Sequence, residues 1–147
     1  MDLSRDRLQA WGPAILWAAF IFAMSTGGFS GDETEGWIEL VARAIYPAIS
    51  AAGIEILNAV IRKAAHVTEY FVFFLLLERG FRLGSEIPET SVRRRALEIA
   101  VLYALTDEAH QAFVPSRTPS LVDCGFDSAG AAAAALLRGY ACIRASR

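Results

Sequence analysis

DEAHQAFVPSRTPSLVDCGFDSAGA, residues 107–131, is the stretch of sequence that decides the fold. Between two strongly apolar stretches it gathers charged, imidazole and amide side chains: Asp107, Glu108, His110, Gln111, Arg117, Asp123 and Asp127. In a soluble bundle such a stretch would be an ordinary loop with capping residues. Next to segments long enough to enter a bilayer, it becomes a candidate functional site. The rest of the chain decides between these two interpretations.

Composition favours membrane helices. The chain has 147 residues, enough for one domain. Of these residues 54% are hydrophobic, and the mean hydropathy of +0.36 is high for a water-soluble protein. The net charge of -2 argues against a nucleic-acid partner, because neutralising a phosphate backbone requires a concentrated basic face.

Four apolar segments are predicted to be membrane spans, at about residues 8–24, 64–82, 96–114 and 121–143. A spanning helix needs about 17 to 25 residues. The chain is therefore predicted to be all-α, a single domain over residues 1–147 that forms a four-helix transmembrane bundle. A soluble four-helix bundle is the alternative, but residues 71–77 and 129–137 are apolar all round. The first segment is also compatible with a cleaved signal peptide, although its length favours an uncleaved anchor.

The first loop, residues 25–58, is predicted to be amphipathic or partly helical. Five of its apolar residues recur at helical spacings of three and four: Trp37, Leu40, Val41, Ala44 and Ile45. Such a helix is expected either on the outer membrane surface, with Trp37 as an interface anchor, or with its apolar face buried against the later segments.

Arginine placement predicts the orientation. Arginines gather before the first segment, between the second and third, and after the fourth: Arg5, Arg7, Arg79, Arg82, Arg93, Arg94, Arg95, Arg138, Arg144 and Arg147. In a four-span topology these places lie on one side, which the positive-inside rule makes cytoplasmic. The protein is thus expected in the cytoplasmic membrane with both termini in the cytoplasm, and with residues 25–58 and 112–120 outside.

Polar side chains mark one end of three segments. Lys63, His66 and Tyr70 share a helix face at spacings of three and seven, with Glu69 beside them, and Asp107 and Gln111 are one turn apart. Asp123 and Asp127 are likewise one turn apart. Each residue alone is compatible with a helix-end charge or cap. The predicted topology brings all three sets to the outer side as one pocket, and no comparable cluster is expected at the cytoplasmic ends.

These elements resemble the VanZ-like family of small bacterial membrane proteins. The resemblance rests on K-x-x-H-x-x-x-Y, D-E-x-x-Q and R-x-x-S-x-x-D, whose positions here are Lys63, His66, Tyr70, Asp107, Glu108, Gln111, Arg117, Ser120 and Asp123. Two positions depart from the family pattern: Ser116 stands where Gly is usual, and Asp127 where Asn is common. The resemblance implies an integral membrane protein of the cell envelope, and some relatives are linked to low-level resistance to the lipid-tailed glycopeptide teicoplanin.

Residue chemistry suggests what such a site does. Lys63 and Arg117 suit a phosphate or carboxylate, and His66 suits a nucleophile or an acid and base. The catalytic candidates are Lys63, His66, Asp107, Glu108, Arg117 and Asp123. The ligand-binding or structural candidates are Tyr70, Gln111, Ser120 and Asp127. The expected ligand is a membrane lipid, a lipid-linked envelope precursor or a lipoglycopeptide, whose head group the site binds or modifies.

Two further possibilities stay open at the level of sequence. His66 with Asp107, Glu108 and Asp123 would form an oxygen-rich set suited to a divalent metal such as Mg²⁺ or Mn²⁺. Alternatively, the protein is not an enzyme, and a buried ion-pair network of Lys63, Arg117 and the carboxylates fixes helix packing or recognises a ligand. The run GAAAAA, residues 130–135, predicts a close-packing face for another helix.

Overall fold

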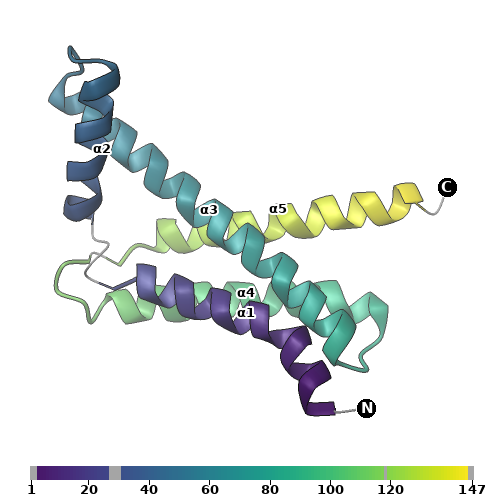
Figure 1. Cartoon of the computed structure of the whole chain (residues 1–147). Helices are drawn as coiled ribbons and strands as arrows, with labels where there is room; N and C mark the ends of the chain where they lie inside the picture. Colours follow the sequence, from purple (N-terminus) through teal and green to yellow (C-terminus); the bar gives the residue numbers. More distant parts are fainter. Residues whose placement is uncertain (1–2, 27–30, 118, 146–147) are drawn as a thin grey trace.

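The computed structural model describes residues 3–26, 31–117 and 119–145. Its elements in chain order are α1 (Leu3–Met24), α2 (Gly31–Ile45), α3 (Ala51–Gly84), α4 (Glu89–Gln111) and α5 (Leu121–Ala145) (Figure 1). The described residues contain no strand, so the all-α prediction is confirmed. Arg147, one of the charges used to predict orientation, lies outside the described residues.

All four predicted apolar segments fall on helices. Residues 8–24 lie in α1, 64–82 in α3 and 121–143 in α5, while α4 contains the third segment except for its last three residues. Over the residues that the structure describes, none of the helices meets the combination of length and apolarity that crossing a membrane requires.

The helix α3 is much longer than the apolar segment inside it. It has 34 residues, which at about 1.5 Å per residue is roughly 51 Å. It begins at Ala51 because Ser50 caps it: the Ser50 hydroxyl accepts a hydrogen bond from the backbone N–H of Gly53 at 3.1 Å. The last residues of the predicted first loop, 51–58, therefore form the start of α3, which begins well before the predicted span.

The helical character of the first loop is confirmed by α2. This helix lies beside the first part of α3, away from the other helices (Figure 1). Asn58 of α3 donates to the carboxylate of Glu35 at 3.3 Å. The apolar stripe of α2 faces outward, because Trp37 is 72% and Leu40 63% exposed. Of the two placements expected for this stripe, burial against the other helices is thus not observed.

The core surrounds the second half of α3, where α3 packs against α1, α4 and α5. Large side chains of α3, including Tyr70 and Phe74, are fully buried. They meet alanines at four-residue spacing on α4 and small residues on α5: Ala96, Ala100, Ala104, Ala131 and Ala134. At Gly130 the two backbones come so close that a Cβ atom would clash with the carbonyl group of Val67. The prediction that residues 130–135 form a close-packing face is confirmed here.

Candidate functional site

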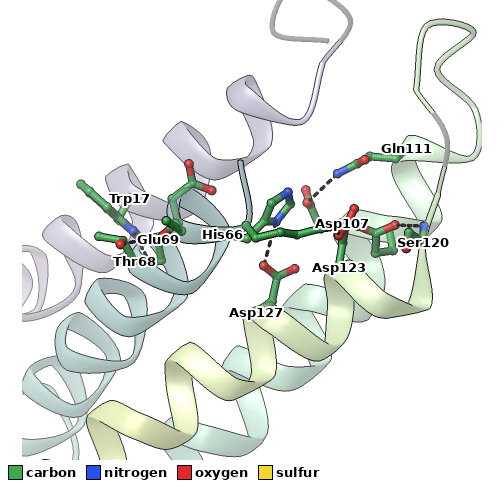
Figure 2. A network of polar contacts seen from close by, with 12 residues as sticks. Trp17, His66, Thr68, Glu69, Asp107, Gln111, Ser120, Asp123 and Asp127 are labelled. Carbon is green, nitrogen blue, oxygen red and sulfur yellow. Dashed lines mark hydrogen bonds and ion pairs between the residues drawn. The ribbon is translucent and has the colours of Figure 1, made fainter. Parts of the chain in front are cut away.

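Polar side chains from three helices meet at one end of the bundle, here called the site end and defined by Lys63, Asp107 and Asp123. The set comprises Lys63 and His66 of α3, Asp107, Glu108 and Gln111 of α4, and Asp123 and Asp127 of α5 (Figure 2). The four carboxylates are between 0 and 7% exposed. Buried carboxylates require hydrogen-bond or charge partners, so their contacts indicate how the site is organised.

His66 and Asp127 form the most deeply buried pair. The His66 Nδ1 atom lies 2.9 Å from Oδ1 of Asp127, and the two side chains point toward each other between α3 and α5 (Figure 2). Asp127 is fully buried, and its Oδ2 atom has no partner among the described residues. No other hydrogen bond to the His66 ring occurs within the described ranges, so Nε2 remains for a ligand or a proton.

Lys63 and Asp123 form a second pair one turn away. The ammonium group of Lys63 contacts Oδ1 of Asp123 and lies 5.3 Å from the centre of the Phe126 ring. This is a cation–π distance. Because α3 and α5 run in the same direction, residues one turn apart on one helix meet residues one turn apart on the other. The two pairs therefore fix the register of α3 against α5.

The carboxylates of α4 have different roles. Gln111 donates from Nε2 to Oδ2 of Asp107 at 3.1 Å, within one helix. Glu108 accepts the backbone N–H of Ser120 at 2.6 Å, immediately before α5 begins. Ser120 thus contributes its backbone rather than its hydroxyl group. Oδ1 of Asp107 and Oε1 of Glu108 are buried with no partner among the described residues.

Arg117 is positioned by backbone carbonyls. Its guanidinium group donates to the carbonyl of Thr26 at 3.0 and 3.2 Å and also to that of Met24, the last residue of α1. Burial, followed by the neighbouring cation Arg62, lowers the pKa of Arg117. Arg117 thus caps the end of α1, while the Asp123 carboxylate contacts Lys63 instead.

A cavity of about 320 Å³ opens beside this cluster. Its polar lining includes Arg62, His66, Glu69, Asp107, Gln111 and Arg117, and its apolar lining includes Ile21, Met24, Trp37, Ile38 and Ile61. The cavity, here called the site cavity and defined by these residues, combines two cations, two carboxylates and an imidazole with an apolar side. Lys63, Glu108, Asp123 and Asp127 stand behind it and do not line it.

Sequence reasoning missed Arg62, and of the two roles left open for Tyr70, ligand binding or structure, its burial favours the structural one. The signal for Arg62 was present, since it precedes His66 by four residues and shares its helix face. Tyr70 is fully buried, its hydroxyl group has no partner among the described residues, and its ring lies edge-on to Phe73 at 6.1 Å. Tyr70 therefore belongs to the core beneath the cluster.

The carboxylates and His66 do not gather as a metal-binding group. Among the residues that the structure describes, no set of three or more His, Cys, Asp or Glu side chains is arranged to hold a metal ion. The carboxylates are distributed to separate partners instead: Asp123 to Lys63, Asp127 to His66 and Glu108 to the start of α5.

The expectation that the opposite end carries no polar cluster was wrong. Glu78 of α3 is 2% exposed and binds two cations, Arg82 of its own helix and Arg138 of α5. In the sequence Glu78 directly follows an apolar run, near the end of the span predicted at residues 64–82. In the structure α5 packs over this part of α3, and its Arg138 contacts Glu78.

Comparison with known proteins gives one match. A family model described as VanZ/LLP1 matches residues 10–140, which include every residue of the cluster and of the site cavity. No curated protein and no solved structure matches the chain.

Proposed function

The chain belongs to the VanZ/LLP1 family, and we propose that it is a membrane protein whose site cavity binds the anionic head group of a lipid-tailed envelope molecule. The ligand class comprises membrane lipids, lipid-linked envelope precursors and lipoglycopeptides. The observation that carries the proposal is the divided lining of the cavity. Arg62 and Arg117 offer guanidinium donors to a phosphate or carboxylate, while Ile38 and Ile61 offer a surface to an apolar tail.

Exposed apolar side chains support a membrane location. They lie along α1, α4 and α5: Leu8, Ile15, Leu16, Phe20, Phe22, Ile99, Leu102, Leu105, Leu136, Leu137 and Tyr140. Soluble monomers rarely expose so much contiguous apolar surface, whereas a bilayer would cover it. The outward stripe of α2 with Trp37 suits the membrane interface.

The proposed orientation places the site end outside the cell. It follows from the arginines, which are concentrated at the other end. Reporter fusions after Ser116 and after Arg147 test it: an enzyme active only in the periplasm should work at Ser116, and one active only in the cytoplasm at Arg147. The reverse pattern would put the site cavity on the cytoplasmic side.

Ligand binding is tested with two probes that differ in one group. Undecaprenyl phosphate carries a phosphate on a polyisoprenoid tail, and undecaprenol is the same tail without it. The purified full-length protein in detergent should bind the phosphate at least about tenfold more tightly, because a charge-assisted hydrogen bond contributes about 1.5 to 3 kcal/mol. Arg62→Gln should remove most of this difference.

Arg43→Gln is the matched control. Arg43 lies on α2 outside the site cavity and pairs with Glu39, so this variant makes the same charge change without altering the lining. Equal binding of both probes by the wild type contradicts the proposal. Equal losses in Arg62→Gln and Arg43→Gln would mean that general surface charge attracts the phosphate.

Acid–base chemistry is a second candidate function, favoured by the His66–Asp127 pair. A buried carboxylate that holds Nδ1 of an imidazole leaves Nε2 oriented for proton transfer. Hydrolysis of the terminal phosphate of undecaprenyl diphosphate, followed as released inorganic phosphate, tests it. His66→Gln should stop the release while binding stays within about twofold. A wild-type protein that binds this compound without releasing phosphate supports binding alone.

One observation supports the alternative that buried ion pairs fix helix packing. The Lys63–Asp123 pair stands behind the site cavity and joins α3 to α5, as a packing element would. This packing role is compatible with ligand binding in the site cavity, since neither Lys63 nor Asp123 lines that cavity.

A further inference from the structure

A second cavity, of about 440 Å³, lies at the opposite end of the bundle. It is here called the arginine pocket and is lined by Leu75, Glu78, Arg79, Arg82, Leu83 and Arg138. Glu78 follows His66 by twelve positions on α3, so the two cavities are roughly 18 Å apart along this helix. None of the residues that line the arginine pocket lines the site cavity.

Glu78 holds two arginines in fixed positions. Its Oε1 atom accepts from Nη2 of Arg82 at 3.1 Å, and its Oε2 atom accepts from Nε of Arg138 at 2.8 Å. Because α3 and α5 each supply one cation, the buried carboxylate organises a site between helices. Arg79 adds a third cation, whose Nη1 atom donates to the backbone carbonyls of Gln9 and Ala10 in α1.

Positive charge is in excess in this pocket. Three guanidinium groups face one carboxylate in its lining, and Glu89, which also pairs with Arg82, is 61% exposed outside the lining. A guanidinium group has five N–H donors on three nitrogens. Within the described residues, the hydrogen bonds of Arg79, Arg82 and Arg138 each involve a single nitrogen. Most donors of the three side chains thus remain for a ligand.

We propose that the arginine pocket binds a phosphate group, as carried by the head of an anionic phospholipid. Guanidinium groups match phosphate oxygens in pairs of parallel hydrogen bonds. Basic pockets between membrane helices recognise phospholipid heads in this way. Leu75 and Leu83 in the lining favour a ligand with acyl chains over a free phosphate. The proposal that the arginine pocket binds phosphate does not depend on the site cavity. The proposal that this phosphate belongs to a lipid rests on the proposed membrane location.

The experiment compares two lipids on the intact protein. Full-length protein in detergent is mixed with equal amounts of phosphatidylglycerol and phosphatidylcholine, and the lipids retained are measured by native mass spectrometry. Phosphatidylglycerol should be retained preferentially. Arg79→Gln should weaken its binding about tenfold, the loss expected for charge-assisted hydrogen bonds, and it leaves both partners of Glu78 in place.

Arg95→Gln is the matched control, since Arg95 is exposed on α4 outside the arginine pocket. Leu83→Glu is an independent test, because Leu83 is 63% exposed and a carboxylate there would repel an anion without disturbing the core. If Arg79→Gln does not fold, the binding of phosphatidylglycerol by Leu83→Glu tests the proposal instead. Equal losses in Arg79→Gln and Arg95→Gln, or unchanged binding in Leu83→Glu, would overturn the proposal.

Inorganic phosphate distinguishes the two sources. At matched ionic strength, phosphate in place of chloride should raise the melting midpoint of the wild type and not that of Arg79→Gln if the pocket accepts soluble phosphate. If phosphate raises the wild-type midpoint but the two lipids are retained equally, the ligand of the arginine pocket is a soluble phosphate compound. Absence of both the lipid preference and the phosphate effect refutes the phosphate site.

Discussion

Gly130 is the position where the helix crossing beneath the site is most sensitive to a single added carbon. A Cβ atom there would lie 2.9 Å from the carbonyl carbon and 3.0 Å from the Cα atom of Val67, and closer still to the carbonyl oxygen. The obstacle is backbone, so no side-chain rotation relieves it. Gly130→Ala must therefore push α5 away from α3.

The expected cost follows from two opposing effects. Alanine is favoured over glycine inside a helix by about 1 kcal/mol. Overpacking a close contact costs about 1 to 3 kcal/mol, occasionally more, and a clash with backbone belongs to the upper part of this range. The net loss is about 2 kcal/mol, which for a chain of this size lowers the melting midpoint by roughly 4 to 8 °C.

The same displacement should damage the site. Val67 follows His66 directly, and Gly130 is three residues after Asp127, so the clash lies beside their 2.9 Å contact. Moving α5 outward by about 1 Å would break this hydrogen bond, since N···O distances beyond about 3.5 Å no longer qualify. Gly130→Ala should therefore also reduce any phosphate release from undecaprenyl diphosphate, because the proposed proton transfer depends on the His66–Asp127 contact.

Thermal unfolding followed by circular dichroism, in one detergent, measures the effect. Gly125→Ala is the control: it lies on the same helix, and a Cβ atom there meets nothing within 4 Å. This variant should melt at or slightly above the wild-type temperature. The reasoning is refuted if Gly130→Ala melts as high as the wild type or shifts by the same amount as Gly125→Ala.

Three further substitutions are expected to separate the contacts of the site by their melting midpoints. Asp127→Ala leaves His66 without its partner and should lower the free energy of unfolding by about 1 to 3 kcal/mol. Asp127→Asn keeps an acceptor for the imidazole and should lower it less. Equal shifts of the melting midpoint in the two variants would mean that the hydrogen bond contributes nothing. Lys63→Gln leaves the buried carboxylate of Asp123 without its cation and should lower the free energy of unfolding by about 1 to 3 kcal/mol. Lys63→Arg keeps the charge and should melt near the wild type. Identical midpoints for the two variants would show that the Lys63–Asp123 pair does not stabilise the fold. Arg117→Ala removes the donors to the carbonyls of Met24, the last residue of α1, and of Thr26 just after it, and should cost about 1.5 to 3 kcal/mol. An unchanged midpoint would show that this cap is not stabilising.

Helical spacing made the residues of the site predictable. His66, Asp107 and Asp127 each lie one turn from another polar residue on their own segments, so each segment has a polar face at one end. Alternation of the four segments then brings these ends to the same side. Arg62, four residues before His66, shares this spacing.

The partners of these residues could not be read from spacing. A helical pattern states which side chains share a face, but not how that helix is rotated against its neighbours. Asp123 pairs with Lys63 and not with Arg117 because Gly130 lets α5 approach α3 closely. Arg117 binds the backbone carbonyls of Met24, at the end of α1, and of Thr26 just after it, and carbonyl acceptors leave no mark in a sequence.

The sequence by itself determined that the chain is helical, where its apolar segments lie, and that one end of the bundle carries titratable side chains. These properties are local, since they depend on residues within a few turns of one another. Only the tertiary structure decided that Glu78 is buried between two arginines, that the α2 stripe faces outward, and which carboxylate holds which cation. These outcomes depend on contacts between residues up to about sixty positions apart in sequence, and such contacts are set by the distances and rotations of packed helices rather than by any local pattern.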